Sequence, residues 1–170
     1  MNESCGQLDR VNGGRREVVP TISLQPQRFA ESRAARYGRA MPIDATRPYD
    51  PANIFARILR GEIPSKTVYE DEFALAFHDI APWSPTHILV IPKGPYVSWD
   101  DFSAKAGDAE IAGFVRAVGH VARAAGLVEP GYRLLANAGP NSHQEVPHLH
   151  VHILAGRPLG PMLIKNDSHK

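Results

Sequence analysis

The chain of 170 residues has the size of one domain, or of one domain with a tail. Its 43% hydrophobic and 22% charged residues are ordinary for a globular protein and exclude a fibrous or wholly disordered class. No apolar run approaches the roughly 18 residues of a membrane span, and the first thirty residues lack the apolar stretch of a secretory signal. The sequence therefore predicts a cytoplasmic protein without a membrane partner.

Charge is distributed unevenly along the chain. Residues 1–41 carry seven arginines and four acidic residues, whereas residues 42–170 carry twelve basic and fourteen acidic side chains. A slightly acidic body without a basic stripe predicts no specific nucleic-acid partner. The single cysteine, Cys5, excludes an internal disulfide and a thiolate metal cage.

Composition divides the chain into three parts. Residues 1–46 mix Gly, Pro, Arg, Ser and Gln with few large apolar side chains, which predicts a disordered N-terminal extension. Residues 47–157 have the patterns of a folded domain, and residues 158–170 are expected to form a C-terminal tail.

The predicted domain opens with a short helix and a hairpin. Asp50 and Pro51 mark the start of a helix that ends at Gly61. Two short strands are expected at residues 67–69 and 73–77, with an acidic turn between them. The β-branched run at 86–92, bounded by prolines, predicts a third and well-buried strand.

The second half adds one helix and two strands. A long helix is predicted from Asp108 to Ala125, with Gly126 as its stop. Strands are expected at residues 132–136 and from His148 to Leu154. Strands in runs joined by short turns favour an α+β fold, here a five-stranded antiparallel sheet with one short and one long helix.

The most distinctive segment is the alternating run His148-Leu149-His150-Val151-His152. Alternate side chains of a strand face opposite ways, so the three imidazoles are expected on one face while Leu149, Val151 and Ile153 enter the core. A neutral imidazole is a competent nucleophile near pH 7, and its neighbours can orient it and bind phosphate oxygens. The run predicts nucleophilic catalysis on a phosphate ester or amide.

A metal site is the competing interpretation of these histidines. At about 3.3 Å per residue, His148 and His152 stand roughly 13 Å apart, whereas two nitrogens bound to one zinc lie only about 3.3 Å apart. All three therefore cannot hold one ion, and the expectation is a site without a metal cofactor. Zinc or another divalent ion bound by two of them stays an alternative, with further ligands drawn from His87, Glu145 and Asp79.

The histidine run resembles the His-x-His-x-His-x-x signature of the histidine triad superfamily. Further stretches over roughly residues 50–157 are similar, in the same order, to its Hint branch: Ile54-Phe55 to Ile63-Pro64, Phe77-His78-Asp79-Ile80, Pro85-Thr86-His87 to Ile91-Pro92, and Asn137-Ala-Gly139. The resemblance implies a homodimer that pairs through the long helix and an edge strand, and a purine nucleotide as substrate.

The resemblance also implies catalytic roles. His150 would attack the α-phosphorus of a nucleoside 5′-phosphoramidate of the AMP type, forming a nucleotidyl-histidine that water hydrolyses. His148 would orient this nucleophile. His152 and His87 would contact the phosphate oxygens, and main-chain N–H groups from Gln144 to His148 would stabilise the transition state.

Substrate-binding positions carry over in the same way. Asp79 would hold the ribose hydroxyls, Asn137 would lie near the phosphate, and an apolar cleft for the base would be formed by Phe55, Ile58, Phe77 and Ile80. The apolar residues are alternatively plain core, and Asp79 alternatively a turn cap. His78 and His120 are expected outside the site, and His143 at its rim.

Two stretches depart from the Hint pattern. His143-Gln144-Glu145 stands where the family usually has Gly-Gln-Ser or Gly-Gln-Thr, so a carboxylate replaces a hydroxyl near the phosphate, where it could itself donate the proton. Residues 157–162 replace an aromatic, Pro-rich ending. The leaving group therefore stays open, and so do two alternatives: a dinucleoside polyphosphate hydrolase and a nucleotide-binding regulatory protein with little turnover.

Overall fold

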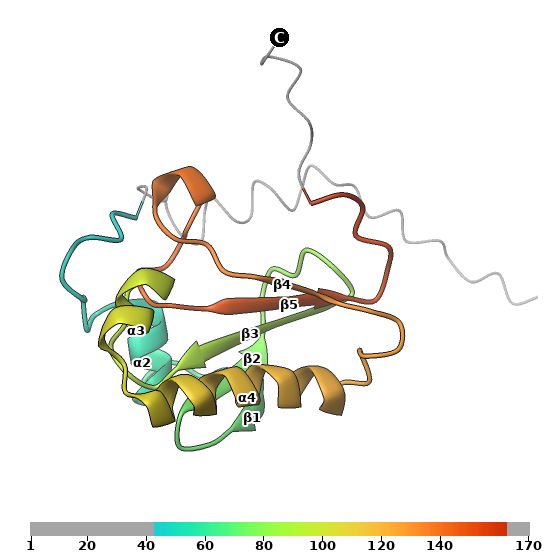
Figure 1. Ribbon diagram of the computed structural model, residues 1–170, viewed down its shortest axis with the longest axis horizontal. Helices are drawn as coiled ribbons and strands as arrows, with labels where there is room; N and C mark the ends of the chain where they lie inside the picture. Colours follow the sequence, from blue (N-terminus) through green and yellow to red (C-terminus); the bar gives the residue numbers. More distant parts are fainter. Residues whose placement is uncertain (1–42, 163–170) are drawn as a thin grey trace, which may run out of the picture.

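The computed structural model describes residues 43–162, whose framework is one five-stranded sheet (Figure 1). The strands lie in the order β1-β2-β3-β5-β4, and every neighbouring pair is antiparallel. Their bounds are β1 Thr67–Glu70, β2 Ala74–His78, β3 Thr86–Pro92, β4 Arg133–Leu135 and β5 Val151–Ala155. The predicted α+β fold with a five-stranded antiparallel sheet is confirmed.

Helix α4 (Asp108–Ala124) lies along one face of the sheet (Figure 1). Phe114 of α4 is fully buried against small and β-branched residues of the central strands, among them Ala76, Val90 and Ile153. As predicted, α4 ends before Gly126, whose φ of +69° belongs to the left-handed region that glycine adopts without strain. This layer forms the larger core of the described chain.

The other face of the sheet carries a smaller apolar cluster beneath helix α2 (Ile54–Leu59). Phe55 of α2 packs edge-to-face on Phe77, with their ring centroids 5.6 Å apart. Alternation along β2 and β3 supplies the cluster, because Leu75 and Leu89 face α2 while their neighbours face α4. This α2 face is also the face that carries the histidines.

Several element boundaries differ from the sequence prediction. Helix α2 begins at Ile54 rather than at Asp50, because Asp50 folds into a turn of its own and the Asn53 side chain caps the helix by accepting from the N–H groups of Phe55 and Ala56. The strand expected over residues 132–136 is limited to Arg133–Leu135.

The last strand begins at Val151 rather than at His148. Its pairing with β3 ends at Val90 opposite Val151, and the N–H of Leu149 donates instead to the carbonyl of Tyr96, in the loop beyond β3. Pro92, which ends β3, has no N–H to continue the ladder.

The prediction of two helices missed one. Helix α3 (Trp99–Lys105) precedes α4, and the Asp101 carboxylate accepts from the N–H groups of Val97 and Ser98 at its start. A 3-10 turn, η1 (Pro140–Ser142), lies in the loop before the histidines.

Most of the predicted N-terminal extension and C-terminal tail lies outside the described residues. Within residues 43–162, none of the helices has the length and apolar character that crossing a bilayer requires.

The histidine row and its surroundings

His148 is fully buried and uses both ring nitrogens within the protein. Its Nε2 lies 2.9 Å from the Pro92 carbonyl and its Nδ1 lies 2.6 Å from the hydroxyl of Tyr49. A carbonyl oxygen only accepts, so Nε2 carries the proton and Nδ1 accepts from Tyr49. Burial lowers the pKa of His148 to about 4, opposed by the bond to Pro92. His148 is therefore a neutral imidazole of defined tautomer at neutral pH.

His150 has the opposite tautomer. Its Nδ1 lies 2.7 Å from the main-chain carbonyl of His148, which only accepts, so Nδ1 carries the proton and Nε2 keeps its lone pair. Burial is the main cause that lowers the pKa of His150, and the bond to the His148 carbonyl together with the charges of Glu145 and Asp79 partly oppose it. The result is a neutral imidazole with an unprotonated Nε2.

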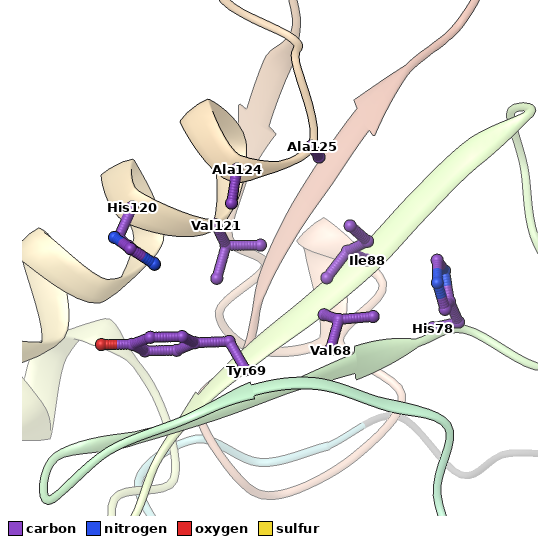
Figure 2. A pocket seen from close by; sticks show the side chains of 8 residues that line it. All are labelled: Val68, Tyr69, His78, Ile88, His120, Val121, Ala124 and Ala125. Carbon is purple, nitrogen blue, oxygen red and sulfur yellow. The ribbon is translucent and has the colours of Figure 1, made fainter.

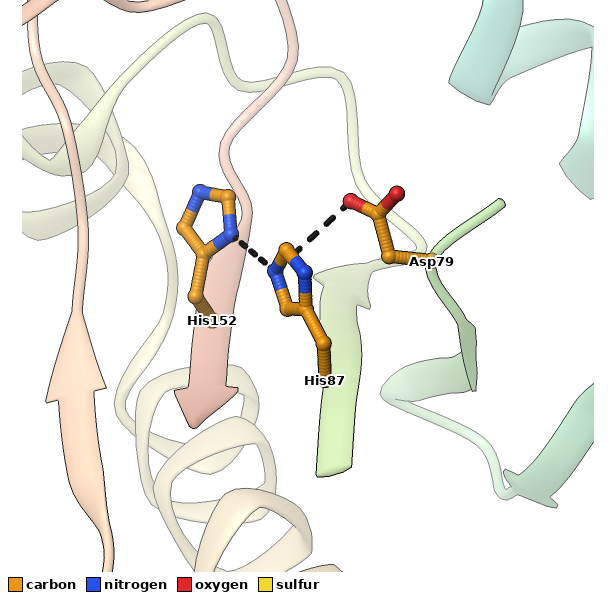
Figure 3. A group of neighbouring side chains, drawn as sticks. All are labelled: Asp79, His87 and His152. Atoms are coloured by element: carbon orange, nitrogen blue, oxygen red, sulfur yellow. Dashed lines mark hydrogen bonds and ion pairs between the residues drawn. The ribbon is translucent and has the colours of Figure 1, made fainter. Parts of the chain in front are cut away.

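His152, in β5, belongs to a polar cluster with His87 and Asp79 (Figure 3). The main-chain N–H of Trp83 donates to His87 Nδ1 at 3.2 Å, so in its neutral form His87 carries its proton on Nε2. That atom lies 2.8 Å from His152 Nδ1 and 3.6 Å from Asp79 Oδ2. His152 Nδ1 accepts, and its Nε2 is left to carry a proton.

The same cluster is the candidate metal site within residues 43–162. One ligand atom each from Asp79, His87 and His152 lies within 4.8 Å of the others. However, the two imidazole nitrogens are 2.8 Å apart and hydrogen-bonded, closer than the roughly 3.3 Å of two nitrogens bound to one tetrahedral zinc. These residues would hold a metal only after that hydrogen bond opened. Of the histidine row, His152 belongs to this group of possible ligands.

Gln144 organises the loop in front of the row. It is buried, its Oε1 accepts from the N–H of Gly139, and its Nε2 donates to the carbonyls of Val97 and Val146. The side chain therefore ties η1, the start of α3 and the approach to His148 together. The prediction of main-chain N–H groups near the phosphate stays a prediction, and the Gln144 side chain itself is committed to the loop.

The predicted base-binding residues occupy different environments. Phe55 and Phe77 are buried, and Ile58 packs partly buried beside them. The Phe55 ring also contacts two histidines, with centroids 5.3 Å from His150 and 6.2 Å from His148. Ile80, in contrast, is 66% exposed. Phe55 thus joins the apolar cluster to His150, while Ile80 lies at the surface.

The remaining predicted polar positions lie around this core. Asp79 accepts from the N–H of Ala81 at 2.7 Å with one oxygen, as a turn cap does, and places the other near His87. Asn137 is half-buried in the loop after β4. Glu145 is exposed, and its carboxylate lies 3.5 Å from His143 Nε2. Both residues belong to the stretch 143–145 that departs from the Hint pattern.

The other two histidines within residues 43–162 lie away from the row, as predicted. His78 and His120 are exposed, and both line a pocket of about 220 Å³ between α4 and strands β1 and β3 (Figure 2). His120 packs against the ring of Tyr69, with centroids 4.7 Å apart. Ile88 of β3 and Val121 of α4 belong to the larger core, which places this pocket on the sheet face opposite His150.

The sequence analysis missed two partners of His148 and one of His87. Tyr49 precedes His148 by 99 positions, and no spacing rule connects them. The Pro92 carbonyl and the Trp83 N–H are main-chain groups, which any residue supplies. A pattern of residue types cannot identify contacts of this kind.

Comparison with known proteins agrees with this geometry. Residues 60–159, more than half of the chain, match the family model described as the HIT domain. The chain belongs to the HIT domain family. An HIT-like protein of Azospirillum brasilense is 70% identical over 117 residues, 69% of this chain and 96% of that protein. A purine nucleoside phosphoramidase of Escherichia coli is 46% identical over 110 residues, 65% of this chain and 92% of that protein.

Solved HIT structures share the fold. A histidine triad protein from Clostridium difficile superimposes with a TM-score of 0.57 at 42% identity, covering 64% of this chain and 93% of that protein. The HIT histidine row is therefore the candidate active site, and the predicted histidine triad resemblance is confirmed.

Proposed function

We propose that this protein hydrolyses purine nucleoside 5′-phosphoramidates through a nucleotidyl-histidine formed on His150. The observation that carries the proposal is the hydrogen bond from His150 Nδ1 to the His148 carbonyl, which leaves the Nε2 lone pair as the nucleophile. The relative in Escherichia coli named purine nucleoside phosphoramidase supports the substrate class.

The first step forms one bond and breaks one. His150 Nε2 attacks the α-phosphorus, the bond from phosphorus to the leaving amine breaks, and that nitrogen takes up a proton. Glu145, at the rim beside His143, is the proposed proton donor. The imidazole becomes a cation that the His148 carbonyl stabilises through Nδ1–H.

The second step releases the nucleotide. Water attacks the same phosphorus, the bond from phosphorus to Nε2 breaks, and His150 returns to its neutral form while the proton from water restores the donor. In both steps the Nε2–H of His152 and main-chain N–H groups of the loop beyond Gln144 would stabilise the developing charge on the phosphate oxygens. Phe55 and its apolar neighbours would hold the base, with Asp79 on the ribose.

The test is release of AMP from adenosine 5′-phosphoramidate by wild type and by His150→Ala. We expect loss of at least about 1,000-fold in kcat/KM on removal of the nucleophile, and recovery of a nucleotidyl-enzyme by mass spectrometry from wild type quenched in denaturant at alkaline pH, where the phosphorus–nitrogen bond survives. The matched control is His78→Ala, which removes an exposed histidine outside the row. Equal rates in wild type and His150→Ala would refute the proposed chemistry.

We also propose that the protein is a homodimer. β4 is an edge strand of the sheet, and its apolar side chains are open: Leu134 is 49% and Leu135 is 37% exposed. On α4, Val115 is 52% exposed. An unpaired apolar edge is a template for pairing with a second chain. Light scattering should give twice the mass of one chain for wild type, and Leu134→Lys should reduce it to one; a monomeric wild type would contradict the proposal.

A further inference from the structure

We propose that Tyr49 is a positioning residue of this site: its hydroxyl holds His148 as the neutral Nε2–H tautomer and thereby fixes the carbonyl that orients His150. The inference rests on the proposed function, because it assigns Tyr49 a part in the reaction of His150. Tyr49 is not among the residues that the histidine triad resemblance singles out. It also precedes residues 60–159, the part of the chain that matches the HIT domain.

The geometry holds the His148 ring at both ends. Tyr49 donates to Nδ1 at 2.6 Å while Nε2 donates to Pro92 at 2.9 Å, and the Tyr49 ring lies edge-on to His148 with centroids 5.5 Å apart. Burial raises the pKa of Tyr49, so the hydroxyl keeps its proton. A flipped ring would lose both bonds, and a buried polar group left without its bond is costly. One orientation and one tautomer result.

The constraint reaches His150 through the main chain. The carbonyl that accepts from His150 Nδ1 belongs to His148 itself, so a main-chain shift at His148, once its side chain is no longer held, moves the acceptor that selects the tautomer of the proposed nucleophile. A second proton on His148 would also displace the Tyr49 hydroxyl and place a positive charge beside the imidazolium that forms on His150. Tyr49 opposes both changes.

Tyr49 is itself anchored by the chain that leads into α2. Asp50 accepts from the N–H of Ala52, and its carbonyl accepts from the side chain and main chain of Asn53. Arg60 donates to the carbonyl of Pro51 from the far end of the helix. The turn that replaces the predicted first helical residues therefore places Tyr49 over His148.

Other charged groups face this pair and have to be considered in a pH experiment. His150 and Asp101 act on His148 electrostatically, the first lowering and the second raising its pKa. Asp50 and Arg60 act on Tyr49. All four are retained in the variant below, so a difference from wild type reports the hydroxyl alone.

The experiment compares full-length wild type with Tyr49→Phe, using Tyr69→Phe as the matched control. The Tyr69→Phe variant also loses a hydroxyl that donates to another side chain, that of Asp71, at 2.8 Å. Tyr69, however, packs against His120 on the opposite face of the sheet. Long-range proton-nitrogen spectra of 15N-histidine protein report the tautomer and titration of His148 directly. Steady-state kinetics on adenosine 5′-phosphoramidate report its consequence.

In wild type and Tyr69→Phe we expect His148 to stay in the Nε2–H form. In Tyr49→Phe its titration should move to higher pH, because the neutral form loses a donor. We expect kcat to fall about three- to tenfold, the effect of one hydrogen bond, with KM little changed and the acid limb of the pH profile moved upward. If the role of Tyr49 were purely structural, Tyr49→Phe would lower the melting temperature but leave the His148 tautomer, its titration and the pH profile as in wild type. That result would overturn the inference.

A second variant keeps the inference testable if Tyr49→Phe does not fold. Incorporation of 3-fluorotyrosine at position 49 keeps the ring and makes its hydroxyl a stronger donor, so the His148 titration should move to lower pH; no movement would overturn the inference. If wild type has no phosphoramidase activity but the spectra change as expected, the proposed function fails and the positioning of His148 by Tyr49 stands.

Discussion

The two ends of the histidine row place the same residue type in contrasting surroundings. At one end His148 is fully buried between Tyr49 and the Pro92 carbonyl, and its pKa is lowered to about 4. At the other end His152 meets His87 and, through it, the carboxylate of Asp79. His150 lies between them.

The difference shows that the hydrogen-bond partners of each imidazole, and not its residue type, determine which ring nitrogen carries the proton. A main-chain carbonyl that accepts from one nitrogen leaves the other nitrogen basic, as in His150. An imidazole that accepts at Nδ1, as in His152, presents a proton at Nε2. An imidazole with a basic nitrogen and an imidazole with an N–H donor thus stand side by side, with ring centroids 4.9 Å apart. The two ends can be tested separately.

The largest expected effect comes from the polar end. His152→Ala removes the proposed donor to the phosphate and the acceptor of His87, and we expect kcat to fall about 100- to 1,000-fold, as for one lost oxyanion donor. His152→Gln, which keeps an N–H group, should recover part of the rate. Full activity of His152→Ala in the AMP-release assay would remove this end from the mechanism.

Changes at the buried end should alter the stability of the fold as well as the rate. The folded-state pKa of His148 lies below its unfolded value, so at pH values between about 4 and 6.5 the unfolded chain binds the proton and stability falls as pH falls. The full loss is about 3 kcal/mol, and it is absent above pH 6.5. Urea unfolding at pH 7 and at pH 4.5 should show a smaller acid loss for His148→Gln than for wild type; parallel curves would contradict this.

A more moderate effect is expected from the carboxylate at the polar end. Asp79→Asn retains an oxygen for the Ala81 N–H but loses the charge, and we expect KM for the phosphoramidate to rise about tenfold through a weaker hydrogen bond to the ribose. A matched change at an exposed acid, Glu72→Gln, should leave KM as it is. An unaltered KM in Asp79→Asn would reduce Asp79 to a turn cap.

The smallest effect is expected from metal removal. Since Asp79, His87 and His152 would have to separate before they could share an ion, we expect full activity after exhaustive chelation and less than one metal ion per chain by elemental analysis. Activity that disappears with EDTA and returns with zinc would establish the metal alternative instead.

Periodicity predicted much of this architecture and of the row. Alternation placed Leu149, Val151 and Ile153 in the larger core, and the structure buries all three. It succeeds there because a sheet buried by α4 fixes the register of its strands. The row continues to alternate at His148 although the strand begins only at Val151.

Short elements and long-range contacts escaped the sequence analysis for physical reasons. Helix α3 has seven residues and one fully buried anchor, Phe102, which is too little for a helical period to appear. Its signal was the capping pair Ser98 and Asp101. The partners of His148 are brought to it by tertiary packing, so the spacing of residues in the sequence does not predict them.

Gln144 affects how much conformational entropy the loop before the histidine row would lose when a ligand binds. Its three hydrogen bonds hold the loop from Gly139 to Val146 in one conformation in the protein alone. Conformational entropy for these residues is therefore lost when the chain folds and not when a nucleotide arrives. The loop that precedes the histidine row is preorganised, so in the proposed reaction binding energy from the base and the ribose would remain to act on the phosphorus.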